Sequence, residues 1–253
     1  MYRGVKMKHL PRHIINYVIF SFLFACSALL LVKGALTGKS VIPDAIPVSV
    51  EEKKTTQIVI DPGHGGEDGG ASVGDILEKH LNLDVSFTLS DLYTIFGYNS
   101  KLTRTDDRML YDHYGDLSDY TGKRKTYDLR NRLRIAEESG ASLFVGIHMN
   151  KFPAEKYSGL QTYYSTNVAD SKNAATLIQS YAKKYLSTDN KREIKASTDA
   201  IYILKRIKKP AVLVECGFLS NDTERALLLT REYREKLAAS IFASTAEFIS
   251  ANK

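Results

Sequence analysis

Three short apolar runs, each ending near a histidine or a glutamate, constrain the fold of this chain most strongly. They occupy residues 58–61, 142–148 and 211–215. Runs of this length that are rich in β-branched residues and bounded by Gly, Pro or Asn are typical of buried strands. His64, His148 and Glu215 therefore lie at the carboxyl ends of predicted strands. In an open α/β sheet ligands bind at that edge, so three separate segments predict one site.

The remainder of the chain alternates between strand-like and helical patterns. Further strands are predicted at residues 100–104, 160–165 and 200–204, and helices at residues 81–96, 127–138, 171–186 and 231–249. Strands that alternate with helices indicate an α/β layer fold. We therefore predict a single α/β domain over residues 58–253.

A different kind of segment precedes this domain. Residues 14–32 contain no charged side chain, and their length is about that needed to cross a hydrocarbon core of roughly 30 Å. We predict a transmembrane anchor here, with a long signal sequence as the alternative. Residues 1–13 contain four Lys or Arg residues and no acidic residue, so the positive-inside rule predicts that this segment is cytoplasmic. Residues 33–57 are predicted to be a linker, and the domain after them is predicted to be extracytoplasmic on a single-pass cell-membrane protein.

The charge distribution argues against a nucleic-acid partner. The formal net charge is +6, but six basic residues precede the first acidic residue, Asp44, and the rest of the chain carries 29 basic and 29 acidic residues. The excess positive charge thus lies in the residues before Asp44. The rest of the chain is formally neutral, so its net charge would not attract nucleic acid. Only two cysteines occur, Cys26 and Cys216. Because Cys26 lies in the apolar segment, an intrachain disulfide is not expected.

The residue types at the predicted sheet edge indicate a hydrolytic zinc site. Such sites commonly use three protein ligands, and two histidines with one glutamate are an established set. His64 and His148 can supply the histidines, and Glu78 can supply the carboxylate. His80 is an alternative third ligand, although positions two apart on the first turn of a helix point to different faces.

Glu215 has the properties of a catalytic acid/base. It ends an apolar strand, where a carboxylate is costly to bury without a specific role, and a hydrolytic zinc site needs a group that transfers the proton of the attacking water. Cys216 beside it could be interpreted as a nucleophile, but a buried inert thiol is the favoured interpretation. The glycine-rich residues 61–70 lack the spacing of phosphate-binding loops.

Four sequence motifs, in order, resemble those of the zinc-dependent N-acetylmuramoyl-L-alanine amidases of the amidase-3 type. They are IDPGHGGEDGGA, ILEKHLNL, GIHMN and VECGFLSN, and the resemblance covers roughly residues 58–250. It implies that His64, Glu78 and His148 bind Zn²⁺ and that Glu215 is the catalytic residue. It also implies a twisted, mostly parallel sheet with helices on both faces. The implied substrate is the amide between muramic acid and L-alanine in peptidoglycan glycan strands with stem peptides.

The predicted anchor and the stretch at residues 123–133 are similar to the CwlD-like subgroup, which implies a role in spore cortex maturation through muramic lactam formation. The alternatives are a zinc peptidase or deacetylase acting on another cell-wall bond, or a non-catalytic wall-binding protein. An activating partner protein is possible, but the sequence does not identify one.

Three loops bear on substrate access. The short segment at residues 151–158 predicts an open site. The tyrosine-rich segment at residues 106–127 is either a lip of the glycan groove or an ordinary surface loop. A basic cluster, defined as Lys205, Arg206, Lys208 and Lys209, either touches anionic wall polymer or is solvated.

Overall fold

The computed structural model describes residues 57–115, 122–187 and 189–252. All of them belong to one compact unit, Lys54–Lys253. The predicted cytoplasmic segment, anchor and most of the linker lie outside the described residues. Within the described part of the chain, no helix has the length and apolar character needed to cross a membrane.

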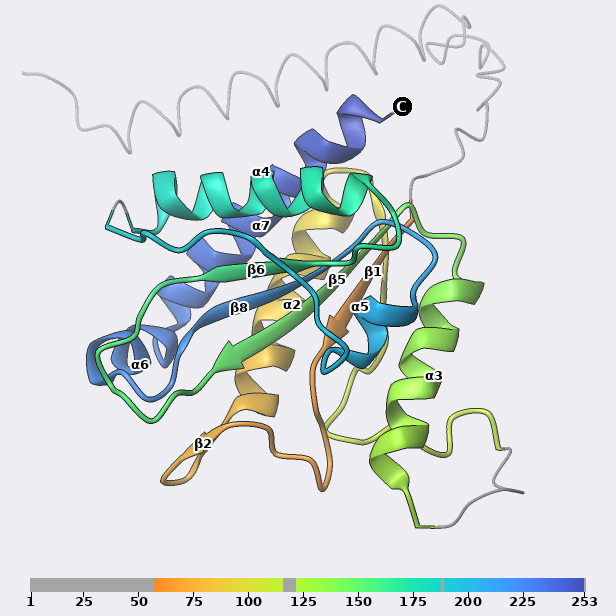
Figure 1. Cartoon of the computed structure of the whole chain (residues 1–253), viewed down its shortest axis with the longest axis horizontal. Helices are drawn as coiled ribbons and strands as arrows, with labels where there is room; N and C mark the ends of the chain where they lie inside the picture. Colours follow the sequence, from red (N-terminus) through yellow and green to blue (C-terminus); the bar gives the residue numbers. More distant parts are fainter. Residues whose placement is uncertain (1–56, 116–121, 188, 253) are drawn as a thin grey trace, which may run out of the picture. The chain divides into compact units, whose positions relative to one another are not determined.

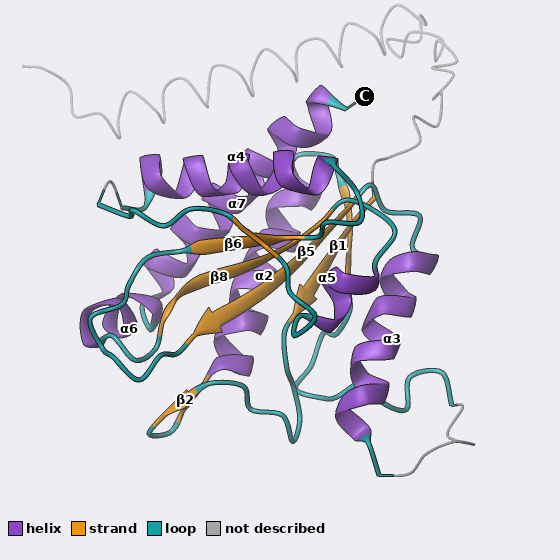
Figure 2. Cartoon of the chain, viewed as in Figure 1, coloured by secondary structure: helices purple, strands orange, loops and turns teal. Residues whose placement is uncertain are grey.

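A six-stranded mixed sheet forms the centre of the domain (Figures 1 and 2). The order of its strands is β4 (Asn99–Leu102), β1 (Gln57–Pro62), β5 (Leu143–Asn150), β8 (Ala211–Phe218), β6 (Gln161–Tyr164) and β7 (Lys195–Ala196). All neighbouring pairs are parallel except β6 and β8, which are antiparallel. The predicted α/β class with a mostly parallel sheet is therefore confirmed.

Helices cover both faces of this sheet. Successive residues of its central strands point to opposite faces, and apolar residues occupy both sets of positions. In β5, Val145 and Ile147 belong to one buried cluster and Phe144 to the other. The first cluster packs against α2 (Glu78–Ile95), α4 (Asp170–Tyr185) and α7 (Arg231–Ala251). The second cluster packs against α3 (Arg124–Glu138) and α5 (Tyr202–Arg206). Continuous apolar runs in the central strands are what a sheet buried on both faces requires.

One predicted strand is wrong. Residues 200–204 do not form a strand, because α5 occupies Tyr202–Arg206. Ile203, Leu204 and Ile207 are buried, and their spacing is that of one helical face, which packs on the sheet. The edge strand is instead β7 (Lys195–Ala196), whose two residues are exposed and carry no apolar pattern.

Two small elements close to the strand ends were also not predicted. The hairpin of β2 (Ser72–Val73) and β3 (Ile76–Leu77) leads directly into α2. The short helix α6 (Asp222–Leu228) follows β8, and Asn221 caps it by accepting a hydrogen bond from the Glu224 amide at 2.9 Å. The hairpin lies between β1 and α2, and α6 follows β8. Both elements therefore follow the carboxyl ends of these strands, where the site is predicted.

The order of the strands creates a switch point beside β1. The chain passes from β1 through α2 to β4 on one side, and from β4 through α3 to β5 on the other side of β1. Connections that diverge in this way leave a crevice at the carboxyl ends of the two central strands. That crevice lies between the ends of β1 and β5, which carry His64 and His148.

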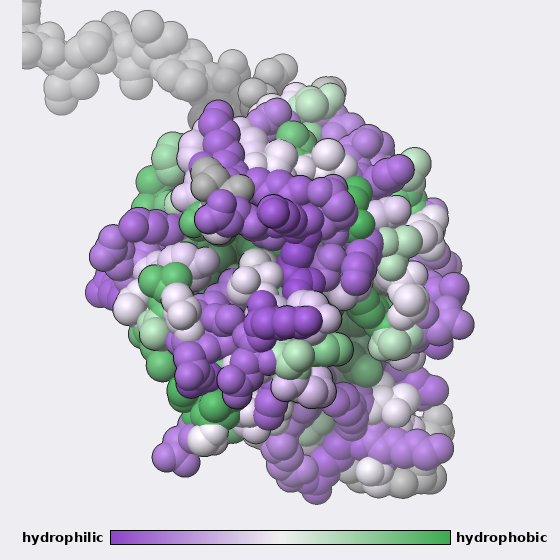
Figure 3. All heavy atoms as spheres, turned by 60° about the vertical axis from the view of Figure 1, so that its left-hand side comes forward, coloured by the Kyte–Doolittle hydropathy of each residue, from purple (hydrophilic) through white to green (hydrophobic). Residues whose placement is uncertain are grey.

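The molecular surface is mainly polar on the face shown in Figure 3, where hydrophobic residues form small separate areas. Among the described residues, the most exposed large apolar side chains are Ile95 and Phe96, which are 74% and 62% exposed. Most of the buried apolar side chains belong to the two clusters. Burial in these clusters is the main source of the domain's stability.

Candidate active site

The structure brings His64, Glu78 and His148 together into one group of potential metal ligands. One ligand atom from each lies within 4.8 Å of the others. Nε2 of His64 is 3.3 Å from Oε2 of Glu78, and Nδ1 of His148 is 3.0 Å from Oε1. Ligands at about 2.0–2.2 Å from a tetrahedral zinc ion lie roughly 3.4 Å apart. The donor types and their spacing therefore fit a zinc ion.

Three different elements position these ligands. His64 lies in the turn after β1, Glu78 is the first residue of α2, and His148 is near the carboxyl end of β5. The Glu78 amide donates to the Ala71 carbonyl at 2.9 Å, and Oε2 of Glu78 accepts a hydrogen bond from the Ala71 amide at 2.7 Å. This reciprocal pair ties the start of α2 to the glycine-rich loop. A carboxylate is also favoured at a helix amino terminus by the helix dipole.

The Glu78 carboxylate is buried and has a complete set of hydrogen-bond donors. Oε1 accepts from the Met149 amide at 3.0 Å and from Nδ2 of Asn82 at 3.1 Å, in addition to its contact with His148. Burial alone would raise the pKa of Glu78, but the contacts with His148 and His64 lower it well below its usual range. Glu78 is therefore an anion, as a metal ligand must be.

His64 has a backbone conformation that few non-glycine residues adopt. Its φ of 63° lies in the left-handed region, and it is the only such non-glycine residue among those described. Buried arginines fix this turn. Nη2 of Arg132 donates to the His64 carbonyl at 2.5 Å, and Nη2 of Arg104 donates to the Gly63 carbonyl at 3.0 Å. Backbone strain of this kind persists only where surrounding contacts determine the conformation.

Arg132 is itself held by two carboxylates. Its Nη1 is 2.7 Å from Oδ1 of Asp61, and its Nε is 2.8 Å from Oδ2 of Asp128. All three side chains are buried. Burial would raise the pKa of Asp61, but the Arg132 guanidinium and the Thr103 hydroxyl outweigh it and lower that pKa. A satisfied buried network of this kind makes the local conformation rigid.

Asp68 contacts His64 on the side away from Glu78. Its Oδ2 lies 2.9 Å from Nδ1 of His64, the arrangement in which a second carboxylate orients a metal-binding histidine. Burial lowers the pKa of His64, but Asp68 and Glu78 together raise it to about 9. A metal ion would therefore displace a proton from His64 when it binds.

Two glycines leave the space that the ligand side chains occupy. A Cβ at Gly63 would lie 2.2 Å from the His148 ring. A Cβ at Gly70 would lie 2.5 Å from Oε2 of Glu78 and 2.8 Å from the His64 ring, and the φ of Gly70 is +70°. The glycine-rich loop therefore allows close approach of backbone and ligands.

We expect Gly70→Ala to weaken zinc binding by more than about tenfold, because the new methyl group displaces the Glu78 carboxylate. Zinc affinity can be measured by competition with a chromogenic chelator. Gly74→Ala is the matched control, since Gly74 also has a positive φ, of +55°, but its Cβ would meet no atom within 4 Å. Equal zinc affinity of the two variants would contradict this account of Gly70.

Glu215 lies beside the ligand group and is not part of it. It pairs with His148 in the register of β5 and β8, and its Oε2 is buried without a hydrogen-bond partner among the described residues. Burial raises the pKa of Glu215 to about 7. A carboxyl group with a pKa near neutrality can both accept and release a proton, as a general acid/base must.

A pocket of about 240 Å³ adjoins His64, His148 and Glu215. Its inner wall is largely apolar and includes Phe144 and Leu213 from the sheet. The His64 and His148 side chains are each 19% exposed, so part of each ring is accessible to solvent.

The competing candidates lie elsewhere or are inert. His80 is exposed and outside the ligand group. Cys216 is a fully buried core residue, and burial raises the pKa of its thiol, which favours the inert interpretation.

The basic cluster is largely engaged in contacts within the domain. Lys205 pairs with Asp199 at 2.9 Å, Arg206 stacks on Tyr202, and Lys209 donates to the Ala136 carbonyl at 2.6 Å. These contacts reduce what the cluster can offer to wall polymer.

Sequence reasoning missed the residues that orient the ligands. Asp68, Asn82, Arg104 and Arg132 each contact a ligand side chain or the His64 turn. A weak signal existed for two of them, because Asp68 and Asn82 are each four residues after a ligand. The arginines gave no such signal, since Arg132 is 68 residues from His64 in the sequence.

The family model described as N-acetylmuramoyl-L-alanine amidase, Amidase_3, matches residues 58–247. The chain belongs to this amidase family. The predicted family is confirmed, and with it the classification of the chain as an N-acetylmuramoyl-L-alanine amidase, a peptidoglycan hydrolase.

Related proteins agree with the family assignment. The germination-specific N-acetylmuramoyl-L-alanine amidase of Bacillus subtilis (strain 168) is 36% identical over 185 residues, which cover 73% of this chain and 76% of that amidase. The CwlD amidase of Clostridioides difficile, solved in complex with the GerS lipoprotein, has a TM-score of 0.72 and 38% identity, covering 78% of this chain and all of that chain. The catalytic domain of the CwlV amidase of Bacillus (Paenibacillus) polymyxa var. colistinus has a TM-score of 0.64 and 27% identity, covering 78% of this chain and 99% of that domain.

Proposed function

We propose that this amidase uses zinc to cleave the amide between the lactyl group of N-acetylmuramic acid and L-alanine. His64, Glu78 and His148 would hold the metal, and Glu215 would be the catalytic acid/base. One observation carries this proposal. The three ligand atoms converge within 4.8 Å, and beside them Glu215 has a buried oxygen without a partner among the described residues.

The chemistry divides between the metal and the protein. When bound, zinc polarises the scissile carbonyl and lowers the pKa of a water molecule at the site. Glu215 accepts the proton of the attacking water, because its pKa of about 7 allows it to be ionised at neutral pH. It then donates that proton to the amide nitrogen as the carbon–nitrogen bond breaks. The buried arginine network keeps His64 in place during these steps.

We extend the proposal to a biological setting that the relatives support. The B. subtilis relative is named a germination-specific amidase, and the C. difficile relative was solved with the GerS lipoprotein. A similar role for this chain would place its action on spore cortex, where removal of the peptide permits muramic lactam formation. A lipoprotein would then be the activating partner, which the sequence alone does not identify.

The proposed location follows from the substrate. Peptidoglycan lies outside the cytoplasmic membrane, so the catalytic domain must be extracytoplasmic. The uncharged segment at residues 14–32, with basic residues before it, supports a single-pass anchor with a cytoplasmic amino terminus.

Product analysis tests the reaction. We would incubate the full-length protein, purified in detergent and loaded with zinc, with defined muropeptides and cortex glycan strands, and identify the products by mass spectrometry. Stem peptides with free L-alanine amino termini are expected. Cleavage within the peptide would indicate a peptidase, loss of acetyl groups a deacetylase, and binding without turnover a wall-binding protein.

Chelation should abolish activity and leave the fold intact. The Glu78 carboxylate accepts hydrogen bonds from two backbone amides and from Asn82, so these donors would still pair its charge after zinc is removed. We expect an unchanged circular dichroism spectrum, a lower Tm because a ligand of the native state has been removed, and complete reactivation by zinc. Loss of secondary structure on chelation would contradict this expectation.

A further inference from the structure

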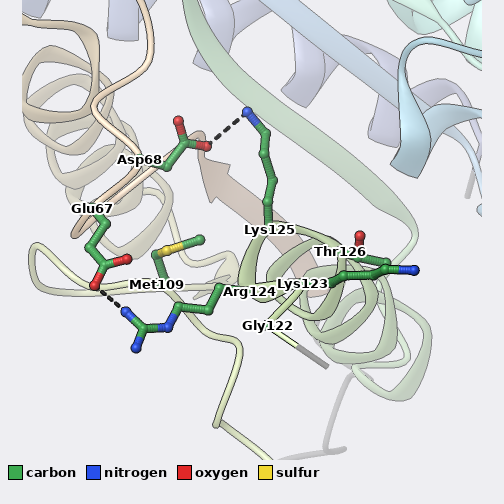
Figure 4. Close-up of a pocket in the computed structure, with 8 residues that line it drawn as sticks. All are labelled: Glu67, Asp68, Met109, Gly122, Lys123, Arg124, Lys125 and Thr126. Carbon is green, nitrogen blue, oxygen red and sulfur yellow. Dashed lines mark hydrogen bonds and ion pairs between the residues drawn. The ribbon is translucent and has the colours of Figure 1, made fainter. Parts of the chain in front are cut away.

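A basic groove lies next to the metal-ligand group. It has a volume of about 820 Å³ and runs between Glu67 and Asp68 of the glycine-rich loop and residues 123–125 at the start of α3 (Figure 4). We call it the α3 groove. Asp68 and Lys125 line both this groove and the pocket beside Glu215. The α3 groove and the pocket that holds Glu215 are therefore adjacent.

The α3 groove carries more positive charge than its own carboxylates balance. Lys125 is 3.3 Å from Asp68, and Arg124 pairs with Glu67. Asp68 is shared, because it also contacts His64. Lys123 forms no ion pair with any residue that the structure describes, and Figure 4 draws no contact for it. Within the described part of the chain, Lys123 is thus an exposed cation without an ionic partner, in a groove whose two acids are already paired.

The position of these cations is unfavourable for the helix itself. The amino terminus of a helix carries partial positive charge, so cations there are repelled and acids are preferred. The first turn of α3 nevertheless contains no acidic residue, and its cap, Lys123, forms no side-chain capping hydrogen bond. The groove therefore combines two sources of positive potential with a position next to the catalytic pocket, and an anionic ligand in it would relieve the repulsion.

The chemistry of the substrate identifies that ligand. In the proposed reaction the lactyl carboxyl group is part of the scissile amide, so the glycan side of the bond has no charge. The amine side is a peptide, which ends in a carboxylate. Only the peptide side therefore carries a negative charge that a positively charged groove can bind.

We propose that the α3 groove binds the carboxylates of the stem peptide and that Lys123 is a specificity-determining residue. This inference rests on the proposed amidase function. It also orients the substrate, with the leaving peptide toward α3 and the glycan strand away from it. Attraction between exposed charges is weakened by salt, so substrate binding through this groove should depend on ionic strength.

The test compares two soluble muramoyl-peptides that differ only in charge. One has free carboxylates, and in the other they are carboxamides. With the full-length, zinc-loaded protein we expect Lys123→Glu to raise KM for the carboxylate substrate by about five- to tenfold, the range for an exposed ion pair whose sign is reversed, with kcat unchanged. KM for the carboxamide substrate should not change. Salt should raise KM for the carboxylate substrate in the wild type and not in Lys123→Glu.

Two control variants separate the groove from general effects. Lys123→Arg keeps the charge and should retain the wild-type KM. Lys172→Glu makes the same charge change at an exposed position on α4, which packs against the other face of the sheet, and it should have no effect. An equal rise in KM for both substrates would overturn the proposal by indicating contact with the glycan. An unchanged KM in Lys123→Glu would overturn it as well.

The same assay distinguishes failure of the groove from failure of the reaction. If the wild-type protein cleaves both substrates with equal kcat/KM and Lys123→Glu behaves identically, the amidase function stands and the peptide-binding role of the groove falls. If the zinc-loaded wild type releases peptide from neither substrate, the proposed function fails, and the inference that rests on it fails too.

Discussion

Glu215→Gln should lower kcat by about 10²- to 10⁴-fold, the usual contribution of a general acid/base. Glutamine has nearly the same shape but cannot accept the proton of the attacking water. Because Glu215 lies outside the three-residue ligand group, zinc binding should persist. The expected combination is full zinc content, measured by elemental analysis, with strongly reduced release of peptide.

A stability measurement completes this experiment. The Oε2 atom of Glu215 has no hydrogen-bond partner among the described residues, and burial raises the pKa of this carboxyl group. A neutral amide removes the cost of burying a charge, so Tm should not fall. Residual activity within about tenfold of wild type would mean that another group transfers the proton.

Glu78→Gln should abolish both zinc binding and activity. Each oxygen of Glu78 accepts a hydrogen bond from a backbone amide, Oε1 from Met149 at 3.0 Å and Oε2 from Ala71 at 2.7 Å. The NH₂ group of glutamine would therefore face one of these two backbone N–H donors, and that donor would lose its acceptor. We expect zinc affinity to fall by more than about 100-fold, beyond the effect of losing a residue that only orients a ligand. The unfolding free energy should fall by about 1–3 kcal/mol because a buried donor is left unpaired.

Glu224→Gln provides the matched control for this variant. Glu224 is also buried and accepts hydrogen bonds from two backbone amides, those of Phe218 at 2.7 Å and Gly159 at 2.9 Å. The same conflict between donors arises there, but Glu224 is not in the ligand group. We expect a similar loss of stability with zinc affinity retained, as measured by denaturant unfolding and chelator competition. Loss of zinc in both variants would show that general destabilisation is the cause.

The fold class and the position of the site could be predicted because local patterns carried them. The central strands β1, β5 and β8 are buried on both faces, so each is a continuous apolar run that is visible in the sequence. His64, His148 and Glu215 lie at the ends of these runs. Parallel strands place their carboxyl ends at one edge, and the group formed by His64, Glu78 and His148 agrees with that expectation.

The failed predictions concern segments without such a pattern. Residues 200–204 are apolar enough to suggest a strand, yet packing of Ile203 and Leu204 against the second cluster makes the segment helical. The edge strand β7 has only two residues, both exposed. Short segments have weak intrinsic preferences, so tertiary contacts decide their conformation.

The sequence by itself determined the α/β class, the family and the residue types of the site, because strand burial and ligand chemistry are local properties. Only the tertiary structure decided how these residues are held. The left-handed turn at His64 depends on Arg132, 68 residues away, and the α3 groove forms where the glycine-rich loop meets residues 123–125. Contacts between such distant segments follow from the order and packing of the strands, which no local pattern specifies.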